Sequence, residues 1–385
     1  ISPFIPGRNM KWSIWTYSHV EIHKKVILHS NPSSNISNQN RTGIIYWTGD
    51  RVDRIEYQML SLLSDGAVSI WKLLDWQDAS LPEFFSKLQE MEKKGLIEIK
   101  DGEVKITEKG RNAGRLKWED MKCSRCEGTG YEILEEIKKE YERIIENRPR
   151  PIEKYDQGYI STEGILRKVS FLMERGDLYA NIFVIGDDDL FSIASALTHI
   201  PKKIVAVDID ERIIDFINEV ADEYSLNIEA YVLDLQKENE NFLHKFDVFV
   251  TDPVETLPGI KLFLSRGASS LKGKGSGYFG LSTLEASRKK WYEIQKMIHD
   301  MGFIITDIRR QFSTYPDDGK NFFEYQNKLP IVRKLSVKVN HNWYKSSLYR
   351  IEAIRNPEPL IKGDIVLGKK FYVDDESWAT PYYDF

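Results

Sequence analysis

The segment 181–195, NIFVIGDDDLFSIAS, is the feature that most narrows the folds open to this chain. Its first five residues form an apolar run typical of a buried parallel strand, and Gly186 ends that run. Apolar residues then recur at helical spacing, at Leu190, Ile193, Ala194 and Leu197. Strand, tight turn and helix in this order predict the first unit of a parallel α/β sheet, in which the helix N-terminus usually faces an anion.

The turn of this unit carries three successive acidic residues, Asp187, Asp188 and Asp189, and it is not glycine-rich. A few acidic residues stabilise a helix N-terminus, but three adjacent carboxylates repel one another. We therefore expect a cation to share this turn, in a pocket for a polycationic substrate beside a nucleotide-like co-substrate. A solvated acidic helix cap is the alternative that these residues alone leave open.

Acidic residues also follow the next three predicted strands, 203–207, 228–233 and 246–251. The carboxyl ends of parallel strands lie at one edge of the sheet, where open α/β sheets bind ligands. Asp208 follows Gly186 by about 20 residues, the spacing at which a Rossmann-type unit places the carboxylate that binds ribose hydroxyls. Asp234 is placed to reach an adenine amino group, and Asp252 and Glu255 follow the fourth strand. The sequence predicts a doubly wound, Rossmann-like α/β domain with an acid-lined ligand edge.

Composition and charge argue against a nucleic-acid-binding protein and against a membrane protein. With 41% hydrophobic and 29% charged residues, the 385-residue chain is typical of globular proteins with two or three domains. Its net charge of −5 gives no global electrostatic basis for binding nucleic acid and weakly favours cationic ligands. No apolar run approaches the length of a membrane span, and we see no signal-peptide pattern. We expect a cytoplasmic protein without a membrane partner.

Changes of pattern along the chain predict five regions. They are an N-terminal extension or linker (1–44), a winged helix-turn-helix domain (45–116), a CxxC knuckle with a connecting helix (117–150), the Rossmann-like catalytic domain (151–356) and a C-terminal tail (357–385). The second region holds helical patterns at 53–63, 67–76 and 82–94, followed by a hairpin with an Asp101-Gly102 turn. Its third helix has no surplus of positive charge. Reading DNA, forming a dimer and covering an active site therefore all remain open.

Cys123 and Cys126 are the two cysteines of the chain and form one CxxC pair. One pair supplies half of a four-cysteine zinc site, so we expect no complete metal site within one chain. A small structural knuckle is favoured over redox catalysis, because the strand and helix of a thioredoxin-like context are missing. A local disulfide and a metal shared across a dimer remain open.

Aromatic and polar residues outside the strand ends are less specific candidates. Gln157 and Tyr159 precede the first strand, and core packing is an equal alternative for the tyrosine. Trp343 and Tyr344 could stack on a cation, although a position in an aromatic core is favoured. The acidic, aromatic end of the chain from Asp374 onward is expected to be mobile or to fold over the pocket.

Three further segments complete the predicted sheet. The glycine-rich run 273–280 lacks the ending of a P-loop and predicts a turn leading into the fifth strand. Additional strands are predicted at 303–308 and near 335–339.

Together these motifs resemble one known family, the branched-chain polyamine synthases (N4-bis(aminopropyl)spermidine synthases) of archaea and thermophilic bacteria. The likeness rests on GDDDL at 186–190, DIDER at 208–212, HKFD at 244–247, TDPVET at 251–256, GYFG at 277–280 and NWYKS at 342–346. It extends over roughly 53–378, and Gly-Asp-Asp-Asp is the hallmark of the family. Val254 stands where the family usually has a second proline, and residues 1–44 have no counterpart that we recognise.

The resemblance implies a transferase that moves aminopropyl groups from decarboxylated S-adenosylmethionine to the N4 amine of spermidine. N4-aminopropylspermidine and then N4-bis(aminopropyl)spermidine are the implied products, with release of 5'-methylthioadenosine. The resemblance also implies a homodimer from a thermophile, with no tightly bound cofactor and with decarboxylated S-adenosylmethionine as co-substrate.

Residue roles follow from the strand-end acids and the resemblance together. Asp188 is predicted to be the general base that deprotonates and orients the attacking amine, because crowded carboxylates raise one another's pKa toward the working range. Acceptor ammonium groups are expected to contact Asp187, Asp189, Asp252, Glu255 and Tyr159. The donor is expected to contact Gly186, Asp208, Asp210, Asp234 and Gln157.

Two other functions remain open. An S-adenosylmethionine-dependent N-methyltransferase of nucleic-acid amines fits Asp252-Pro253 and a winged helix, but no aromatic residue follows that pair. A polyamine-sensing DNA-binding regulator with an inactive catalytic domain would bind DNA at physiological salt.

Overall fold

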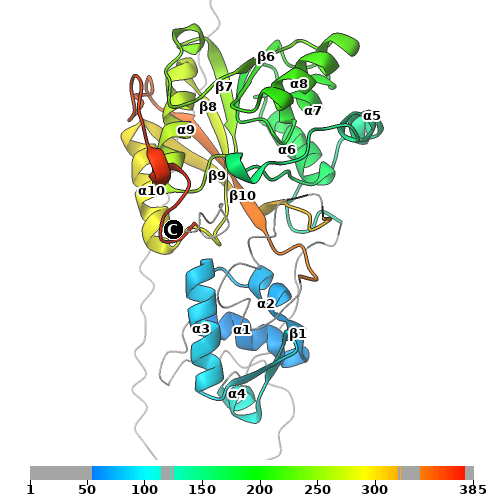
Figure 1. Cartoon of the computed structure of the whole chain (residues 1–385), viewed down its shortest axis with the longest axis vertical. Helices are drawn as coiled ribbons and strands as arrows, with labels where there is room; N and C mark the ends of the chain where they lie inside the picture. Colours follow the sequence, from blue (N-terminus) through cyan, green and yellow to red (C-terminus); the bar gives the residue numbers. More distant parts are fainter. Residues whose placement is uncertain (1–53, 114–122, 124, 320, 322–338, 378–385) are drawn as a thin grey trace, which may run out of the picture. The chain divides into compact units, whose positions relative to one another are not determined.

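The computed structural model describes residues 54–113, 123, 125–319, 321 and 339–377, all within one compact unit. Most of this unit is a seven-stranded sheet with helices on both faces (Figure 1). The strand predicted near 335–339 falls almost entirely on residues outside the described part. No helix among the described residues is both long and apolar enough to span a membrane.

The sheet is mixed, with five parallel strands and an antiparallel edge. The strands follow the order β6-β5-β4-β7-β8-β10-β9. Their bounds are β4 Asn181–Ile185, β5 Lys203–Asp208, β6 Ile228–Val232, β7 Phe246–Thr251, β8 Leu271–Leu281, β9 Phe303–Thr314 and β10 Lys345–Ala353. β10 is antiparallel to both β8 and β9. β4 lies between β5 and β7, so the strand order reverses there, and such a reversal marks the ligand edge of open α/β sheets.

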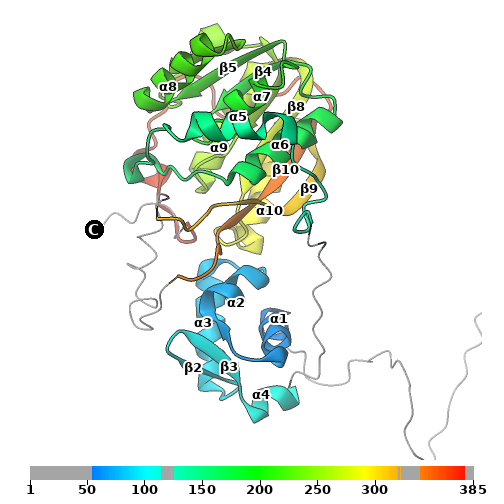
Figure 2. The ribbon, with the colours of Figure 1, turned by 90° about the vertical axis from the view of Figure 1, so that its right-hand side faces the viewer.

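Helices cover both faces of this sheet (Figure 2). One face carries α6 (Thr162–Glu174), α7 (Phe191–Ala196) and α8 (Glu211–Glu223), with α5 (Glu135–Ile145) packed against α6 and α7. The other face carries α9 (Leu257–Ser270) and α10 (Arg288–Asp300). Each face has its own apolar core, as a doubly wound sheet requires.

β4 shows why the apolar run at its position forms a central strand. Ile182 and Val184 belong to the core under α6–α8, whereas Phe183 and Ile185 belong to the core under α9 and α10. A strand buried on both faces needs apolar side chains at every position, which explains the continuous run. Gly186 then turns the chain with a φ of +71°, which a residue with a Cβ adopts with strain.

The elements before the sheet domain form a smaller group. They are α1 (Arg54–Leu62), η1 (Leu63–Asp65), β1 (Val68–Ser69), α2 (Ile70–Trp76), α3 (Leu81–Lys93), β2 (Ile97–Lys100), β3 (Glu103–Ile106) and α4 (Glu108–Ala113). The three strands form a separate sheet in the order β1-β3-β2. Ser80 begins α3 in a capping box with Glu83, and Asp101 and Gly102 turn the β2–β3 hairpin with positive φ angles.

The segment after β10 packs back onto the sheet domain instead of leaving it. The Ile361 amide donates a hydrogen bond to Ser265 Oγ at 3.1 Å. Thr256 Oγ1 donates one to the carbonyl of Phe371 at 2.7 Å, next to η5 (Gly368–Phe371). These contacts hold the segment against α9 and bring part of the predicted C-terminal tail to the ligand edge.

Candidate active site

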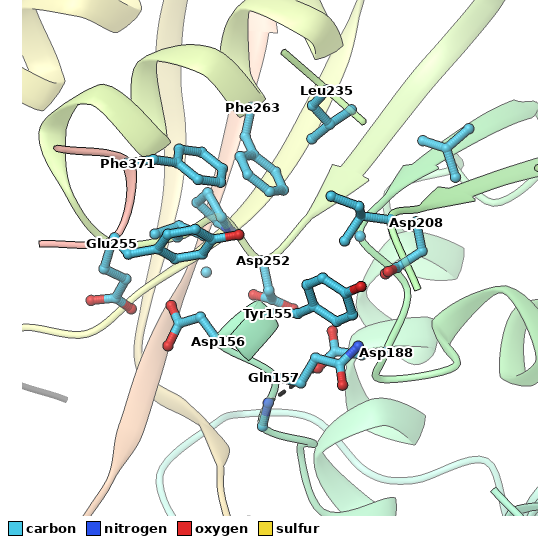
Figure 3. Close-up of a pocket in the computed structure, with 18 of the residues that line it drawn as sticks. Tyr155, Asp156, Gln157, Asp188, Asp208, Leu235, Asp252, Glu255, Phe263 and Phe371 are labelled. Atoms are coloured by element: carbon cyan, nitrogen blue, oxygen red, sulfur yellow. Dashed lines mark hydrogen bonds between the residues drawn. The ribbon is translucent and has the colours of Figure 1, made fainter. Parts of the chain in front are cut away.

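A cavity lies at the carboxyl ends of β4, β5, β6 and β7 (Figure 3). Side chains from these strand ends and from the segment before α6 line it. Seven of the lining side chains are carboxylates: Asp156, Asp188, Asp208, Asp234, Asp252, Glu255 and Glu285. None of the described residues that line the cavity is a lysine or an arginine. Such a cavity concentrates cations.

Apolar side chains and carboxylates meet where β5 and β6 end. Asp208 Oδ2 accepts a hydrogen bond from the amide of Asp187 at 3.0 Å, and its Oδ1 accepts one from the amide of Asp210 at 2.8 Å. Asp234 Oδ1 accepts one from the amide of Gln236 at 2.9 Å. The apolar neighbours in this part of the cavity are Ile209, Leu233, Leu235 and Phe263. An apolar slot edged by carboxylates suits a nucleoside, with the base in the slot and the ribose at Asp208.

Asp188 is the member of the acidic turn that faces the cavity. Its Oδ2 accepts a hydrogen bond from the amide of Gly158 at 3.1 Å, and Arg148 donates to its carbonyl oxygen. Burial raises the pKa of Asp188 to about 7, and the charges of Asp208 and Asp252 add to that rise. A carboxylate that titrates near neutrality can accept a proton from an ammonium group, so the geometry and the pKa both suit a general base.

The other two acids of the turn point elsewhere. Asp187 is fully buried and accepts hydrogen bonds from the amide of Ser192 at 3.3 Å. Asp189 is 4% exposed, and its Oδ1 accepts one from the amide of Ile160 at 2.6 Å. Neither lines the cavity, although both were predicted to contact the acceptor. Their contacts fix the turn that presents Asp188.

Asp252, at the end of β7, is held by a buried cation. Lys168 Nζ lies 2.5 Å from Asp252 Oδ2, and the Lys168 side chain is 1% exposed. Burial by itself would lower the pKa of Lys168, but Asp252 and Asp189 raise it above its ordinary value. Asp252 Oδ1 is buried and has no hydrogen-bond partner among the described residues. One oxygen of Asp252 is therefore anchored, and the other is available to a donor on a ligand.

Gly280, on β8, leaves the space that the unpartnered oxygen of Asp252 occupies. A Cβ at Gly280 would lie 1.9 Å from Asp252 Oδ1, so alanine there must displace the carboxylate. We expect Gly280→Ala to lower kcat/KM by roughly 10²-fold, because displacements near 1 Å in an active site have effects of that size. Gly273→Ala on the same strand is the matched control, because a Cβ there meets no atom within 4 Å. Equal kinetics for the two variants would contradict this role of Gly280.

Three other predicted residues lie around the cavity in different ways. Gln157 lines it and donates a hydrogen bond from Nε2 to Asp210 Oδ2 at 3.0 Å. Asp210 is 3% exposed, pairs with Arg212 at 2.6 Å and does not line the cavity. The Tyr159 hydroxyl donates to Asp318 at 3.0 Å, also outside the cavity lining. Asp210 and Tyr159, which were predicted to contact the substrates, therefore lie behind residues that line the cavity.

Several cavity residues have no motif that identifies them in the sequence. Asp156 lies between Tyr155 and Gln157 in the predicted contact segment, and Glu285 follows β8 in a loop. Lys168 lies behind the lining, and its burial was not visible in the sequence, because it follows Arg167 in α6 and a pair of adjacent basic residues is also typical of an exposed helix face.

Aromatic side chains complete the walls. Tyr315 and Tyr344 line the cavity with ring centroids 5.2 Å apart and planes at 81°. Phe371 and Tyr372 reach it from the segment after β10. Tyr344 lines the cavity and is 9% exposed within an apolar core, and Trp343 is 2% exposed in the same core, so the core position favoured for both residues is found.

The CxxC pair lies outside this cavity. Both cysteines are free thiols, and Cys126 Sγ accepts a hydrogen bond from the amide of Gly130 at 3.4 Å. The amides of Gly130 and Gly128 lower the pKa of Cys126. Among the described residues, no group of three or more histidine, cysteine or acidic side chains is arranged to hold a metal ion.

The acidic cluster makes stability depend on pH. Burial raises the pKa of Asp187 and of Asp188 to about 7 and that of Asp208 to about 6. The ordinary pKa of an aspartate, about 3.9, applies in the unfolded chain. The contribution of these groups to stability is therefore fully present below about pH 4 and is lost as the pH rises through 6 to 7. We expect the melting temperature of Asp188→Asn, minus that of the wild type, to increase between pH 5 and pH 8. A difference that stays constant in differential scanning fluorimetry would contradict the raised pKa.

Comparison with known proteins identifies the family. Residues 136–379 match the family described as the branched-chain polyamine synthase A C-terminal domain. The N(4)-bis(aminopropyl)spermidine synthase of Methanocaldococcus jannaschii is 38% identical over 321 residues, which are 80% of this chain and 90% of that protein. The chain belongs to the branched-chain polyamine synthase family.

Other members of the branched-chain polyamine synthase family also match this chain in sequence and in structure. The Thermococcus kodakarensis N(4)-bis(aminopropyl)spermidine synthase is 36% identical over 324 residues, which are 81% of this chain and 91% of that protein. The Thermus thermophilus branched-chain polyamine synthase, crystallised with N4-aminopropylspermidine and 5'-methylthioadenosine, matches with a TM-score of 0.74 and 28% identity. That match covers 86% of this chain and 93% of the solved chain. The predicted family and the predicted Rossmann-like α/β fold are both confirmed.

Proposed function

We propose that this protein transfers aminopropyl groups from decarboxylated S-adenosylmethionine to the N4 amine of spermidine. The products are N4-aminopropylspermidine and then N4-bis(aminopropyl)spermidine, with one 5'-methylthioadenosine released per transfer. The observation that carries the proposal is that one cavity contains both parts of the site. An apolar slot edged by Asp208 adjoins Asp188 and Asp252 there. A sulfonium nucleoside and a polyamine are the two ligands that such a cavity suits.

The reaction is an in-line displacement on the carbon attached to sulfur. The lone pair of the acceptor nitrogen forms the new N–C bond while the C–S bond breaks, and its electrons return to sulfur as the neutral thioether of methylthioadenosine. The N4 amine must be neutral to attack, and polyamine nitrogens are mostly protonated near pH 7. Asp188, with a pKa of about 7, accepts that proton and orients the lone pair. Alignment of the two substrates supplies a further part of the rate.

We expect charge to make this cavity prefer the decarboxylated donor over S-adenosylmethionine itself. The aminopropyl arm of the decarboxylated donor ends in an ammonium and carries no carboxylate. Seven lining carboxylates attract that ammonium and repel the carboxylate of the ordinary donor. Asp252 Oδ1, buried and without a partner among the described residues, is a candidate acceptor for an ammonium N–H.

Product analysis tests the function. The purified chain is incubated with decarboxylated S-adenosylmethionine and spermidine, and the products are separated and identified by mass spectrometry against branched and linear standards. We expect both branched products and stoichiometric methylthioadenosine. Linear products alone would refute N4 as the acceptor, and methyl transfer from S-adenosylmethionine would instead support the N-methyltransferase.

We also infer that α1, α2 and α3 with the β1-β3-β2 sheet form a winged helix. Three helices followed by a hairpin support that assignment, and the Ser80–Glu83 capping box marks the start of the third helix. An electrophoretic shift assay at physiological salt tests whether this part binds DNA, and sedimentation tests the expected homodimer. The cytoplasmic location, the thermophilic source and the absence of a tightly bound cofactor stay predictions.

A further inference from the structure

The loop after β6 forms one wall of the nucleoside slot. Leu233, Asp234 and Leu235 line the cavity from this loop. Leu235 packs against the apolar core that contains Phe263 of α9, and Figure 3 shows the two side chains next to each other. The Leu233 amide still donates a hydrogen bond to the carbonyl of Asp208 on β5 at 2.8 Å. Beyond Leu233 the chain leaves β6, so other contacts must hold this wall in place.

Arg266, on α9, supplies such a contact from behind the wall. Its Nε donates a hydrogen bond to the carbonyl of Leu235 at 2.8 Å, and its Nη2 donates one to the carbonyl of Gly363 at 2.8 Å. The side chain is 6% exposed and does not line the cavity. One planar guanidinium therefore joins the slot wall, α9 and the segment after β10.

Acidic residues on the same segments balance the charge of Arg266. Its Nη1 lies 3.4 Å from Glu238 Oε1. Burial lowers the pKa of Arg266, and the charges of Glu238, Asp364 and Asp234 act in the opposite direction. The donors of Arg266 are thus directed at the protein and not into the cavity, so its role is to position the wall and not to touch a ligand.

Gln236 joins the loop to the segment after β10 without Arg266. Its carbonyl accepts a hydrogen bond from the amide of Ile365 at 2.8 Å, and its Oε1 accepts one from the amide of Leu367 at 2.9 Å. Loss of Arg266 should therefore shift the wall at Leu235 and leave this segment in place. The folded protein can then be compared with and without the contact.

We propose that Arg266 is a positioning residue for the donor, because its hold on the Leu235 carbonyl sets the width of the nucleoside slot opposite Asp208. A displacement of about 1 Å in such a wall is enough to weaken binding strongly. The acid-lined part of the cavity at Asp188 and Asp252 lies on other strand ends, so binding of the polyamine should not depend on Arg266. This inference rests on the proposed function, in which the slot takes the nucleoside of the donor.

The test compares Arg266→Met with the wild type by calorimetric titration with methylthioadenosine and by steady-state kinetics. We expect the dissociation constant and the KM for the donor to rise roughly ten-fold, because two buried carbonyls lose their donor and the wall shifts. The kcat at saturating donor and the KM for spermidine should stay within about two-fold, because the nucleoside is bound alike in the ground state and in the transition state. The number of binding sites per chain should stay unchanged.

Two further variants separate the fork of hydrogen bonds from charge and from a general effect of losing an arginine. Arg266→Lys keeps the buried charge but not the planar fork, so the dissociation constant should stay raised by roughly five-fold or more. Arg355 is the matched control, because its Nη2 donates to the carbonyl of Asp300 at 3.0 Å on the surface and it does not line the cavity. Arg355→Met should bind methylthioadenosine as the wild type does.

Two results would overturn the role of Arg266. Wild-type affinity in Arg266→Lys would show that charge alone is needed. An unchanged dissociation constant in Arg266→Met, with a lower kcat and fewer binding sites per chain, would show a purely structural role. A wild type that neither binds methylthioadenosine nor transfers an aminopropyl group would instead refute the proposed function, which is a distinct outcome.

Discussion

Replacing Asp188 with asparagine is expected to lower kcat by about 10²- to 10⁴-fold, the usual contribution of a general acid or base. Asparagine keeps the size of the side chain and can still accept the hydrogen bond from the amide of Gly158, but it cannot take a proton from the acceptor. Burial raises the pKa of the aspartate to about 7 in the ligand-free protein, so the wild-type kcat/KM, which reports the free enzyme, should rise between pH 6 and pH 8 as Asp188 deprotonates. Steady-state kinetics over a range of substrate concentrations measure both effects.

Binding of methylthioadenosine is the control for this variant. We expect the nucleoside to contact Asp208 and Leu235 rather than the adjoining Asp188 carboxylate, so the dissociation constant should change less than three-fold, or about 0.7 kcal/mol. Wild-type turnover in the asparagine variant would exclude Asp188 as the base. Lost turnover together with lost nucleoside binding would indicate a disturbed site, and the assignment would lose its support.

Replacing Lys168 with methionine is expected to destabilise the fold by about 3–5 kcal/mol, because it leaves the Asp252 carboxylate, which is only 19% exposed, without its cation. Lys168 is 1% exposed, and Asp252 is the partner at 2.5 Å. Adding Asp252→Asn to this variant should restore part of the lost stability, since the uncompensated charge is then removed. Urea unfolding monitored by circular dichroism gives the free energies of unfolding for the single and double variants.

A surface ion pair provides the matched comparison. Lys203 lies 2.6 Å from Glu229, but its side chain is 40% exposed. Lys203→Met should therefore change the free energy of unfolding by less than about 1 kcal/mol. If Lys168→Met lowers the free energy of unfolding by no more than Lys203→Met does, the Lys168–Asp252 pair does not anchor Asp252.

The ligand edge could be predicted because strand ends are visible in the sequence. Gly186, Asp208, Asp234 and Asp252 each follow an apolar run, and parallel strands bring such positions to one edge. The order β6-β5-β4-β7-β8-β10-β9 then places β4 at the point where the strand order reverses. The local sequence pattern and a general rule of sheet topology were sufficient to predict the strand-end residues of the cavity.

The direction of each side chain could not be predicted in the same way. Asp187, Asp188 and Asp189 are adjacent, yet the turn directs the middle one to the cavity and binds the others to the amides of Ser192 and Ile160. That choice depends on the rotation of each peptide in the turn, which residue types do not specify. The side-chain contacts that hold Asp210 and Tyr159 behind the lining depend on packing in the same manner.

Residues from loops and from a helix interior were missed for another reason. Glu285 reaches the cavity from the loop after β8, and Phe371 reaches it from the segment that follows β10. These contacts join parts of the chain that are far apart in the sequence, and no periodicity relates them. Lys168 was missed as well, because it follows Arg167 in α6 and the sequence does not show that its side chain is buried against an acid.

A crystal structure of the protein with both methylthioadenosine and spermidine bound tests the central claim most directly. With the thioether in the slot beside Asp208, we expect the N4 nitrogen of spermidine within hydrogen-bond distance of the Asp188 carboxylate, about 2.6–3.2 Å. A primary amine of spermidine at Asp188, or spermidine bound outside the acid-lined cavity, would contradict it.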